Sequence, residues 1–237
     1  MAPLLEVRDL GLRRFAEVHA LQRDLCLARS DGRLPHDLLL LVQHPSVYTF
    51  GRGTRATSLP ETPAQLAADG SDVIEIERGG DVTWHGPGQL VAYPILHLSE
   101  LREDLHWYLR ELEQVIIEAS AALGVTAERQ QGRTGVWTNG AKLASIGIHV
   151  KRWVTMHGLA LNVHNNLEAF ERIVPCGIAD VRMTSLQHAL AAAGTAIDAP
   201  TLWNAASRAI VQQMAARFGR TLLEPAAATS TPRGPDD

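Results

Sequence analysis

The sequence RGGDVTWHGPGQ at residues 78–89 runs directly into the apolar segment LVAYPIL at residues 90–96. Four glycines in the first stretch suit backbone that bends sharply or approaches a ligand closely. The same stretch carries an arginine, an aspartate, a threonine, a histidine and a glutamine, which is more donors and acceptors than a simple turn needs. Taken alone, it fits an elaborate turn and a binding site equally well.

Apolar segments on both sides of this loop predict strands. Residues 73–77 alternate between apolar and acidic side chains, which predicts a strand entering the loop, and residues 90–96 form the strand that leaves it. Residues 38–42 are wholly apolar and lie between prolines. Such a run is typical of a strand buried on both faces.

Three long segments have the apolar spacing of amphipathic helices. The first covers residues 11–29 with its arginines directed outward, and the last covers residues 196–217. The longest covers residues 98–123, where Ser99 is in position to cap the first turn. A short helix is expected around residues 63–68.

The dipeptide Asn139-Gly140 is the strongest hairpin signal in the chain. It separates a predicted strand at residues 134–138 from another at residues 143–150. The second of these, and a further strand at residues 158–164, each place large apolar side chains on one face and small ones on the other. Small side chains leave room for a groove.

The 237 residues are enough for one large domain or two small ones. Because no internal repeat or linker is visible, residues 1–224 are expected to form a single catalytic domain. Residues 225–237 consist mainly of Ala, Thr, Ser, Pro, Gly and Asp, which bury too little apolar surface to fold. This tail is expected to be disordered.

Composition narrows the functional class. A net charge of -4 argues against a general nucleic-acid binder. No apolar run approaches the ~20 residues that span a bilayer, and residues 1–6 do not resemble a signal peptide, so a cytoplasmic protein without a membrane partner is expected. Arginines nonetheless recur near the glycine-rich loops, where a basic rim and scattered solvated arginines are equally compatible with the sequence: Arg52, Arg55, Arg78, Arg129, Arg133 and Arg152.

The two cysteines, Cys26 and Cys176, have different surroundings, and no disulfide between them is expected. Cys26 lies on or beside a helical apolar stripe, where a free cysteine packs as a small apolar residue. Cys176 lies between a proline and a glycine in a non-periodic loop. This setting is compatible with a nucleophile that has nearby amide hydrogens available for a developing oxyanion, but an inward-packed loop cysteine fits the local sequence better.

Lys142 is one of two lysines in a chain with twenty arginines. Lysine loses its proton when desolvated and arginine does not, so a lysine between apolar neighbours favours a chemical role. GC-rich codon usage explains the count equally well. The histidines do not have the spacing of a zinc motif, and no metal is expected.

Three motifs together resemble the lipoate-biosynthesis octanoyltransferases, also called lipoyl(octanoyl) transferases. They are the opening stretch at residues 78–89, GAKLASIG at residues 140–147 and PCGI at residues 175–178. Their order along the chain makes the resemblance specific, and the similarity extends from about residue 5 to about residue 220.

The resemblance implies an α/β (α+β) fold in which a mixed β-sheet packs against helices, as in the catalytic domains of lipoate and biotin protein ligases. It implies transfer of an octanoyl group from octanoyl-acyl carrier protein to a lysine of lipoyl domains, in 2-oxoacid dehydrogenases and the glycine cleavage H protein. By matching position, Cys176 would form the acyl-enzyme and Lys142 would be its partner. No cofactor is implied.

The resemblance also implies which residues line the acyl pocket. They are Arg78, Gly79, Gly80, Asp81, Val82, Thr83, Trp84, His85, Ser145, Ile146, Gly147, Gly158, Leu159 and Ala160.

Two other functions remain open at this point. An ATP-dependent lipoate or biotin protein ligase shares the implied fold but needs no cysteine. A non-catalytic module that binds lipoyl domains or acyl groups would form no thioester.

Overall fold

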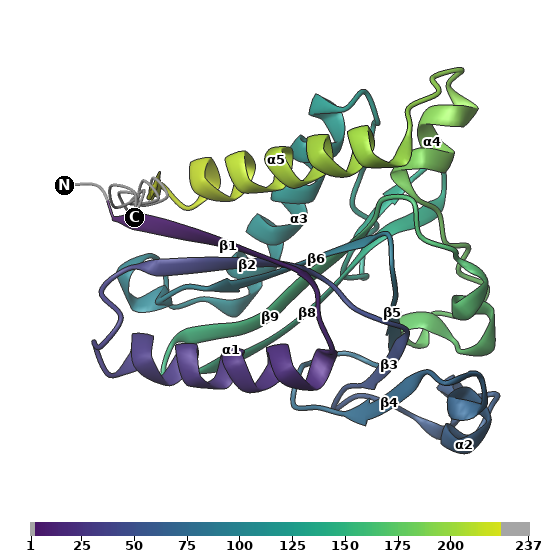
Figure 1. Ribbon diagram of the computed structural model, residues 1–237, viewed down its shortest axis with the longest axis horizontal. Coiled ribbons are helices and arrows are strands. Elements are labelled where there is room, and N and C mark those ends of the chain that lie inside the picture. The colour runs from purple at the N-terminus through teal and green to yellow at the C-terminus, as the bar shows by residue number, and fades with distance from the viewer. Residues whose placement is uncertain (1–2, 224–237) are drawn as a thin grey trace, which may run out of the picture.

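The computed structural model describes residues 3–223, which form two sheets and five α-helices (Figure 1). The larger sheet has seven strands. In spatial order they are β10 (Thr221–Leu222), β1 (Leu4–Leu12), β2 (Asp37–Gln43), β6 (Gln89–Ile95), β9 (Val154–Asn162), β8 (Ala141–Lys151) and β7 (Val136–Thr138). The β10, β1 and β2 strands run parallel and the remaining pairs are antiparallel, so the predicted mixed sheet is confirmed.

The smaller sheet carries the glycine-rich stretch. Its strands are β4 (Asp72–Glu75), β3 (Val47–Phe50) and β5 (Thr83–His85), in that order. The sequence predicts residues 78–89 as a loop, but Thr83–His85 pairs antiparallel with β3. Three residues are too few to produce a recognisable alternation, so this strand exists only through its tertiary partner.

Helices cover both faces of the larger sheet. Helix α1 (Phe15–Ser30) packs on one face, and helices α3 (Leu105–Ala122) and α5 (Ala199–Arg217) pack on the other (Figure 1). In β2, Leu39 and Leu41 join the cluster under α3 and α5, while the alternate leucines join the cluster under α1. The prediction of a strand buried on both faces is therefore confirmed.

Two predicted helix starts are wrong. The first helix begins at Phe15 because residues 4–12 pair with β2 as a strand. The long helix begins at Leu105, where the Asp104 carboxylate accepts a 3.0 Å hydrogen bond from the amide of Trp107. Ser99 instead donates to a glutamate side chain.

The outward direction predicted for the arginines of the first helix fails at Arg29. This side chain is buried and donates to Asp37 at 2.9 Å, so it joins α1 to the start of β2. Apolar periodicity alone assigns every arginine to the solvent side, but an arginine that pairs with a carboxylate, as Arg29 does with Asp37, can be buried.

The remaining elements follow their local signals. The short helix α2 (Pro63–Leu66) and the hairpin between β7 and β8 are present, with Asn139 and Gly140 both at positive φ. Helix α4 (Leu186–Ala192) begins after Ser185, whose hydroxyl accepts a hydrogen bond from the amide of His188. Within residues 3–223, no helix is both long and apolar enough to cross a membrane. The single-domain assignment stays a prediction, and residues 225–237 lie outside the described part of the chain.

Candidate active site

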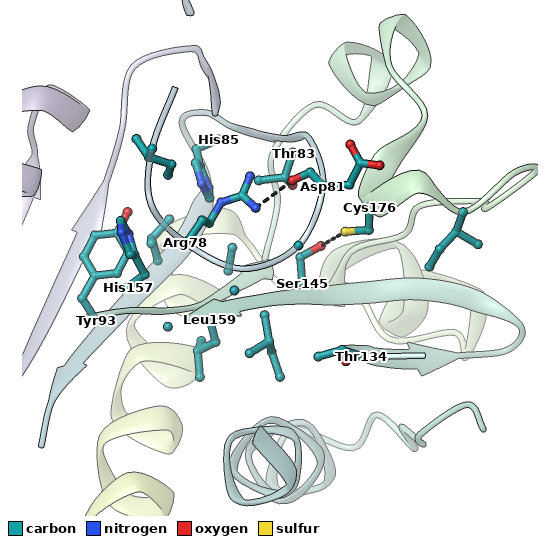
Figure 2. A pocket seen from close by; sticks show the side chains of 18 of the residues that line it. Arg78, Asp81, Thr83, His85, Tyr93, Thr134, Ser145, His157, Leu159 and Cys176 are labelled. Carbon is teal, nitrogen blue, oxygen red and sulfur yellow. Dashed lines mark hydrogen bonds between the residues drawn. The ribbon is translucent and has the colours of Figure 1, made fainter. Parts of the chain in front are cut away.

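A cavity of about 250 Å³ lies between the stretch at residues 80–85 and strands β8 and β9 (Figure 2). Most residues predicted to form the site line this cavity. They are Arg78, Gly80, Asp81, Thr83, His85, Ser145, Ile146, Gly147, Gly158, Leu159, Ala160 and Cys176.

Three residues predicted to line the pocket lie elsewhere. Val82 and Trp84 belong to a separate apolar cluster around Tyr48, and the amide of Gly79 donates to the carbonyl of Ile148. The cause is strand alternation, because successive side chains along β5 point to opposite faces. Thr83 and His85 face the cavity, so their neighbours must face away from it.

The cavity also has walls that the sequence reasoning did not assign to it. Val91 and Tyr93 come from β6, and their alternate spacing along a strand next to the motif is the signal that identifies them. The others come from distant segments without such a signal: Phe15, Ile76, Gly132, Arg133, Thr134, His157 and Ile178.

Cys176 occupies a tight 3-10 turn with a left-handed backbone, φ 57° and ψ 21°. A residue with a Cβ is strained in this region, and such strain is concentrated at functional sites. The next residue, Gly177, is also left-handed, and a Cβ there would lie 2.5 Å from an Asp81 carboxylate oxygen. The turn therefore requires glycine after the cysteine. The sulfur itself is partly buried at the cavity wall.

Lys142 is fully buried on β8, and its ammonium nitrogen lies 3.0 Å from the sulfur of Cys176. Gly135 packs against the Lys142 side chain, where an added Cβ would lie 2.9 Å from Lys142 Cε. The amide of Gly135 donates a hydrogen bond to the buried carboxylate of Glu113. Among the described residues, no carboxylate contacts the ammonium group. A buried ammonium needs a counter-charge, and the Cys176 thiolate is in position to supply it.

The surroundings of Cys176 favour its ionised form. Burial by itself raises the pKa of the thiol, but the charge of Lys142 and the hydrogen bonds from Lys142 and Ser145 outweigh it. The pKa therefore lies below the ordinary thiol value. The hydroxyl of Ser145, on the same strand as Lys142, lies 3.8 Å from the sulfur.

The amides of the Cys176 turn are already in use. The amide of Cys176 donates to the carbonyl of Val82 at 2.9 Å, and the next two amides donate to carbonyls inside the turn. The prediction that these amides are available for an oxyanion is therefore wrong. Two other donors belong to residues that line the cavity, and both atoms are buried without a hydrogen-bond partner among the described residues: Arg78 Nε and Thr83 Oγ1.

Arg78 holds the glycine-rich stretch together. One terminal nitrogen donates to the Asp81 carbonyl at 2.7 Å (Figure 2). The other donates to the Thr49 carbonyl at 2.6 Å, so the guanidinium joins β3 to the loop. A Cβ at Gly147 would lie 2.9 Å from Arg78 Cδ. The small residue on β8 thus makes room for this arginine as well as for a ligand.

His85 is buried beside the cavity, and its Nδ1 donates a 2.7 Å hydrogen bond to the side-chain oxygen of Gln89. Burial, followed by the nearby His44, lowers its pKa to about 3. The imidazole is therefore neutral. It contributes to the cavity wall a polar side chain that Gln89 holds in one orientation.

The arginine rim is present only in part. Arg133 is exposed and lines the cavity, and Arg55 is exposed with its guanidinium 3.7 Å from Asp81. Of the other four, Arg78 is buried, Arg129 pairs with Glu113 at 2.9 Å and Arg152 pairs with Asp31 at 3.2 Å. Arg52 is exposed and does not line the cavity.

Comparison with known proteins agrees with this geometry. A family model described as the lipoyl protein ligase A/B catalytic domain matches residues 15–210. An octanoyltransferase from Geobacter sulfurreducens is 51% identical over 195 residues, which cover 82% of this chain and 80% of the relative. An octanoyltransferase from Gloeobacter violaceus is 52% identical over 168 residues, which cover 71% and 73% respectively.

Two solved structures share the fold. A lipoate-protein ligase A bound with ATP has a TM-score of 0.68 at 12% identity, over 95% of this chain and 89% of that one. A biotin protein ligase from Aquifex aeolicus has a TM-score of 0.51 at 12% identity, over 91% and 73%. At such low identity these two comparisons concern the fold alone. The matched family model and the near 50% identity with the curated relatives show that the chain belongs to the octanoyltransferases of the lipoyl protein ligase A/B catalytic domain family, which are acyltransferases.

Proposed function

We propose that this acyltransferase moves an octanoyl group from octanoyl-acyl carrier protein to a specific lysine of lipoyl domains, through a thioester on Cys176. The acceptors are the lipoyl domains of 2-oxoacid dehydrogenases and the glycine cleavage H protein, and residues 1–224 act as one catalytic domain. The observation that carries the proposal is the 3.0 Å contact between Lys142 and the Cys176 sulfur at the wall of the cavity.

In the first half-reaction, the Cys176 thiolate attacks the carbonyl carbon of the carrier thioester. A carbon–sulfur bond to Cys176 forms and the bond to the carrier sulfur breaks. The Lys142 ammonium gives its proton to the departing carrier thiolate, which leaves as a thiol. The enzyme then holds an acyl-thioester beside a neutral Lys142 amine.

In the second half-reaction, the acceptor lysine attacks the Cys176 thioester as a free amine. Its nitrogen becomes acylated, Lys142 takes the proton that this nitrogen loses, and Cys176 leaves as a thiolate. The starting thiolate–ammonium pair is restored, so protons balance over the whole cycle without a further base.

Proton transfer is the main contribution that we assign to Lys142. Lowering a thiol pKa increases the thiolate fraction, but the nucleophilicity of that thiolate falls with a Brønsted slope of about 0.4–0.5. The two effects largely cancel. A group that alternates between acid and base contributes about 10²–10⁴-fold, which is the larger effect.

Both half-reactions pass through a tetrahedral oxyanion, and we assign its stabilisation to Arg78 Nε and Thr83 Oγ1. Arg78 and Thr83 line the cavity with Cys176, and these two atoms are buried without a hydrogen-bond partner among the described residues, which is costly unless a ligand satisfies them. The glycine-rich stretch then serves the carbonyl end of the substrate, while the cavity beyond it takes the acyl chain.

Intact mass spectrometry after incubation with octanoyl-carrier tests the proposal. The expected result is one octanoyl adduct, located on Cys176, labile to hydroxylamine and lost when a lipoyl-domain acceptor is added. An adduct that persists with the acceptor present contradicts the transfer step. ATP-dependent modification that survives Cys176→Ser identifies an adenylating ligase instead.

A further inference from the structure

Three side chains from separate elements meet at the end of the cavity opposite Cys176. His19 comes from α1, Glu77 follows β4, and His157 comes from β9. Each offers one ligand atom, and the three atoms all lie within 4.8 Å of one another. Figure 2 shows His157 beside Tyr93, at the far end from the sulfur.

His157 has a free nitrogen inside the protein. The residue is 2% exposed, and its Nε2 is buried without a hydrogen-bond partner among the described residues. Its backbone is left-handed at φ 57°, and the side chain of Gln22 accepts a 2.8 Å hydrogen bond from its amide. A buried imidazole nitrogen that makes no hydrogen bond costs free energy unless a ligand occupies it.

The other two members already interact. His19 Nε2 lies 3.0 Å from the Glu77 carboxylate, and both side chains are partly exposed. Arg23 also donates to Glu77 at 3.3 Å, but its side chain is 60% exposed and free to move into solvent. Water and ions therefore reach the cluster from the α1 side.

We propose that His19, Glu77 and His157 bind a divalent transition-metal ion of the zinc class. Two imidazoles and one carboxylate are ligands that Zn²⁺ and its first-row neighbours take readily, whereas Mg²⁺ and Ca²⁺ require mainly oxygen. Zinc holds such ligands at about 2.0–2.2 Å, so two ligand atoms on one ion lie closer than about 4.4 Å. Rotation of the partly exposed His19 and Glu77 closes the remaining gap.

The bound ion stabilises the end of the cavity opposite Cys176 and takes no part in the thioester chemistry. His157 lines the cavity together with Phe15, the first residue of the helix that carries His19. An ion on His19 and His157 joins α1 to β9 and fixes the His157 ring. The end wall is then held in one position.

Isothermal titration with Zn²⁺ tests the site in full-length protein prepared without a polyhistidine tag. The Cys176→Ala background removes the thiolate as a competing zinc ligand. We expect one ion per chain and no detectable binding of Mg²⁺. His19→Ala and Glu77→Gln, each in that background, weaken Zn²⁺ binding by about 100-fold or more, since losing even an outer partner of a ligand costs 10–100-fold.

The matched control is His106→Ala, which removes an exposed histidine on α3. It leaves zinc binding unchanged. Circular dichroism verifies that each variant is folded, and Zn²⁺ raises the unfolding temperature of the background protein but not that of His19→Ala. Absence of a one-to-one site in the Cys176→Ala protein overturns the proposal. So does a Zn²⁺ affinity of the His19→Ala and Glu77→Gln proteins that equals the affinity of the Cys176→Ala background.

Discussion

The amide of Cys176 donates a 2.9 Å hydrogen bond to the carbonyl of Val82, which attaches the turn that carries the thiol to the glycine-rich stretch. Asp81, the residue before Val82, accepts hydrogen bonds from Ser58 at 2.6 Å and from the Val82 amide at 2.7 Å. Two motifs far apart in sequence therefore form one rigid wall.

Gly177→Ala tests this wall. The glycine has φ 65°, and an added Cβ meets the Asp81 carboxylate at 2.5 Å, so the turn must shift. We expect a stability loss of about 1–3 kcal/mol and a fall in kcat/KM of about 100-fold or more, because a small misplacement of a reacting atom is costly. Gly194→Ala is the control: its φ is 80° but nothing lies within 4 Å, so stability falls and activity does not. Equal activity in the two variants contradicts the prediction.

Lys142→Arg keeps the positive charge and removes the ability to exchange a proton. We expect kcat to fall by about 10²–10⁴-fold. Lys142→Met, which retains the length and loses the charge, is measured beside it by single-turnover acylation. If the arginine variant acylates at a near-normal rate, Lys142 acts only through its charge and the proton-transfer role fails.

The reactivity of Cys176 toward iodoacetamide should depend on pH through Lys142. Because the pKa of Cys176 is lowered, alkylation rises at a pH below the ordinary thiol value of about 8.5. In Lys142→Met the charge and the hydrogen bond of Lys142 are lost, and burial is opposed only by the hydrogen bond from Ser145 and the charge of Arg78, so the midpoint moves to higher pH. Cys26 is buried with a raised pKa and stays unreactive, and Cys26→Ala verifies this. A midpoint that Lys142→Met leaves in place is the contrary result.

The lowered pKa of Cys176 also makes the free energy of unfolding depend on pH, and the direction of this dependence can be predicted. The thiol pKa is lower in the folded protein than in the unfolded chain, so this group stabilises the fold above the unfolded value. The contribution disappears as the pH falls through the folded pKa. Urea denaturation at several pH values measures this contribution as the difference in the free energy of unfolding between the wild type and Cys176→Ser.

Thr83→Val removes one unpartnered hydroxyl at nearly constant volume. If Thr83 binds the oxyanion, kcat falls on the order of 10²-fold, and Thr83→Ser restores most of it. The unfolding temperature of the valine variant should stay the same or rise, because no hydrogen bond is lost in the free enzyme. A valine variant within threefold of wild type rules out the assignment.

Arg133→Glu probes docking of an acidic carrier at the cavity mouth. We expect kcat/KM for carrier-bound donor to fall several-fold at low ionic strength and the difference to shrink as salt screens the charge. Arg152→Glu makes the same charge change at an arginine that pairs with Asp31 and does not line the cavity. Identical salt profiles for the two variants speak against steering by Arg133.

Apolar periodicity predicted those elements that can be recognised from their own sequence, without knowing which elements they pack against. The strand at β2 and the helix at α5 are long or uniformly apolar, and the Asn139-Gly140 turn has a local requirement for positive φ. The strand β1 was missed because its nine residues show no clean alternation and depend on pairing with β2. The start of α3 was misplaced because several polar residues before Leu105 fit a helix as well as a turn.

For the candidate site, the sequence by itself determined which residue types stand in which local setting: Cys176 in a glycine turn, Lys142 between apolar neighbours and a glycine-rich stretch with polar side chains. These are local properties, and residue type with spacing is enough to read them. Only the tertiary structure decided that Lys142 and Cys176 lie 3.0 Å apart, that the turn's amides are occupied and that His157 lines the cavity. Such contacts depend on strand pairing and helix packing between distant segments, which no local pattern encodes.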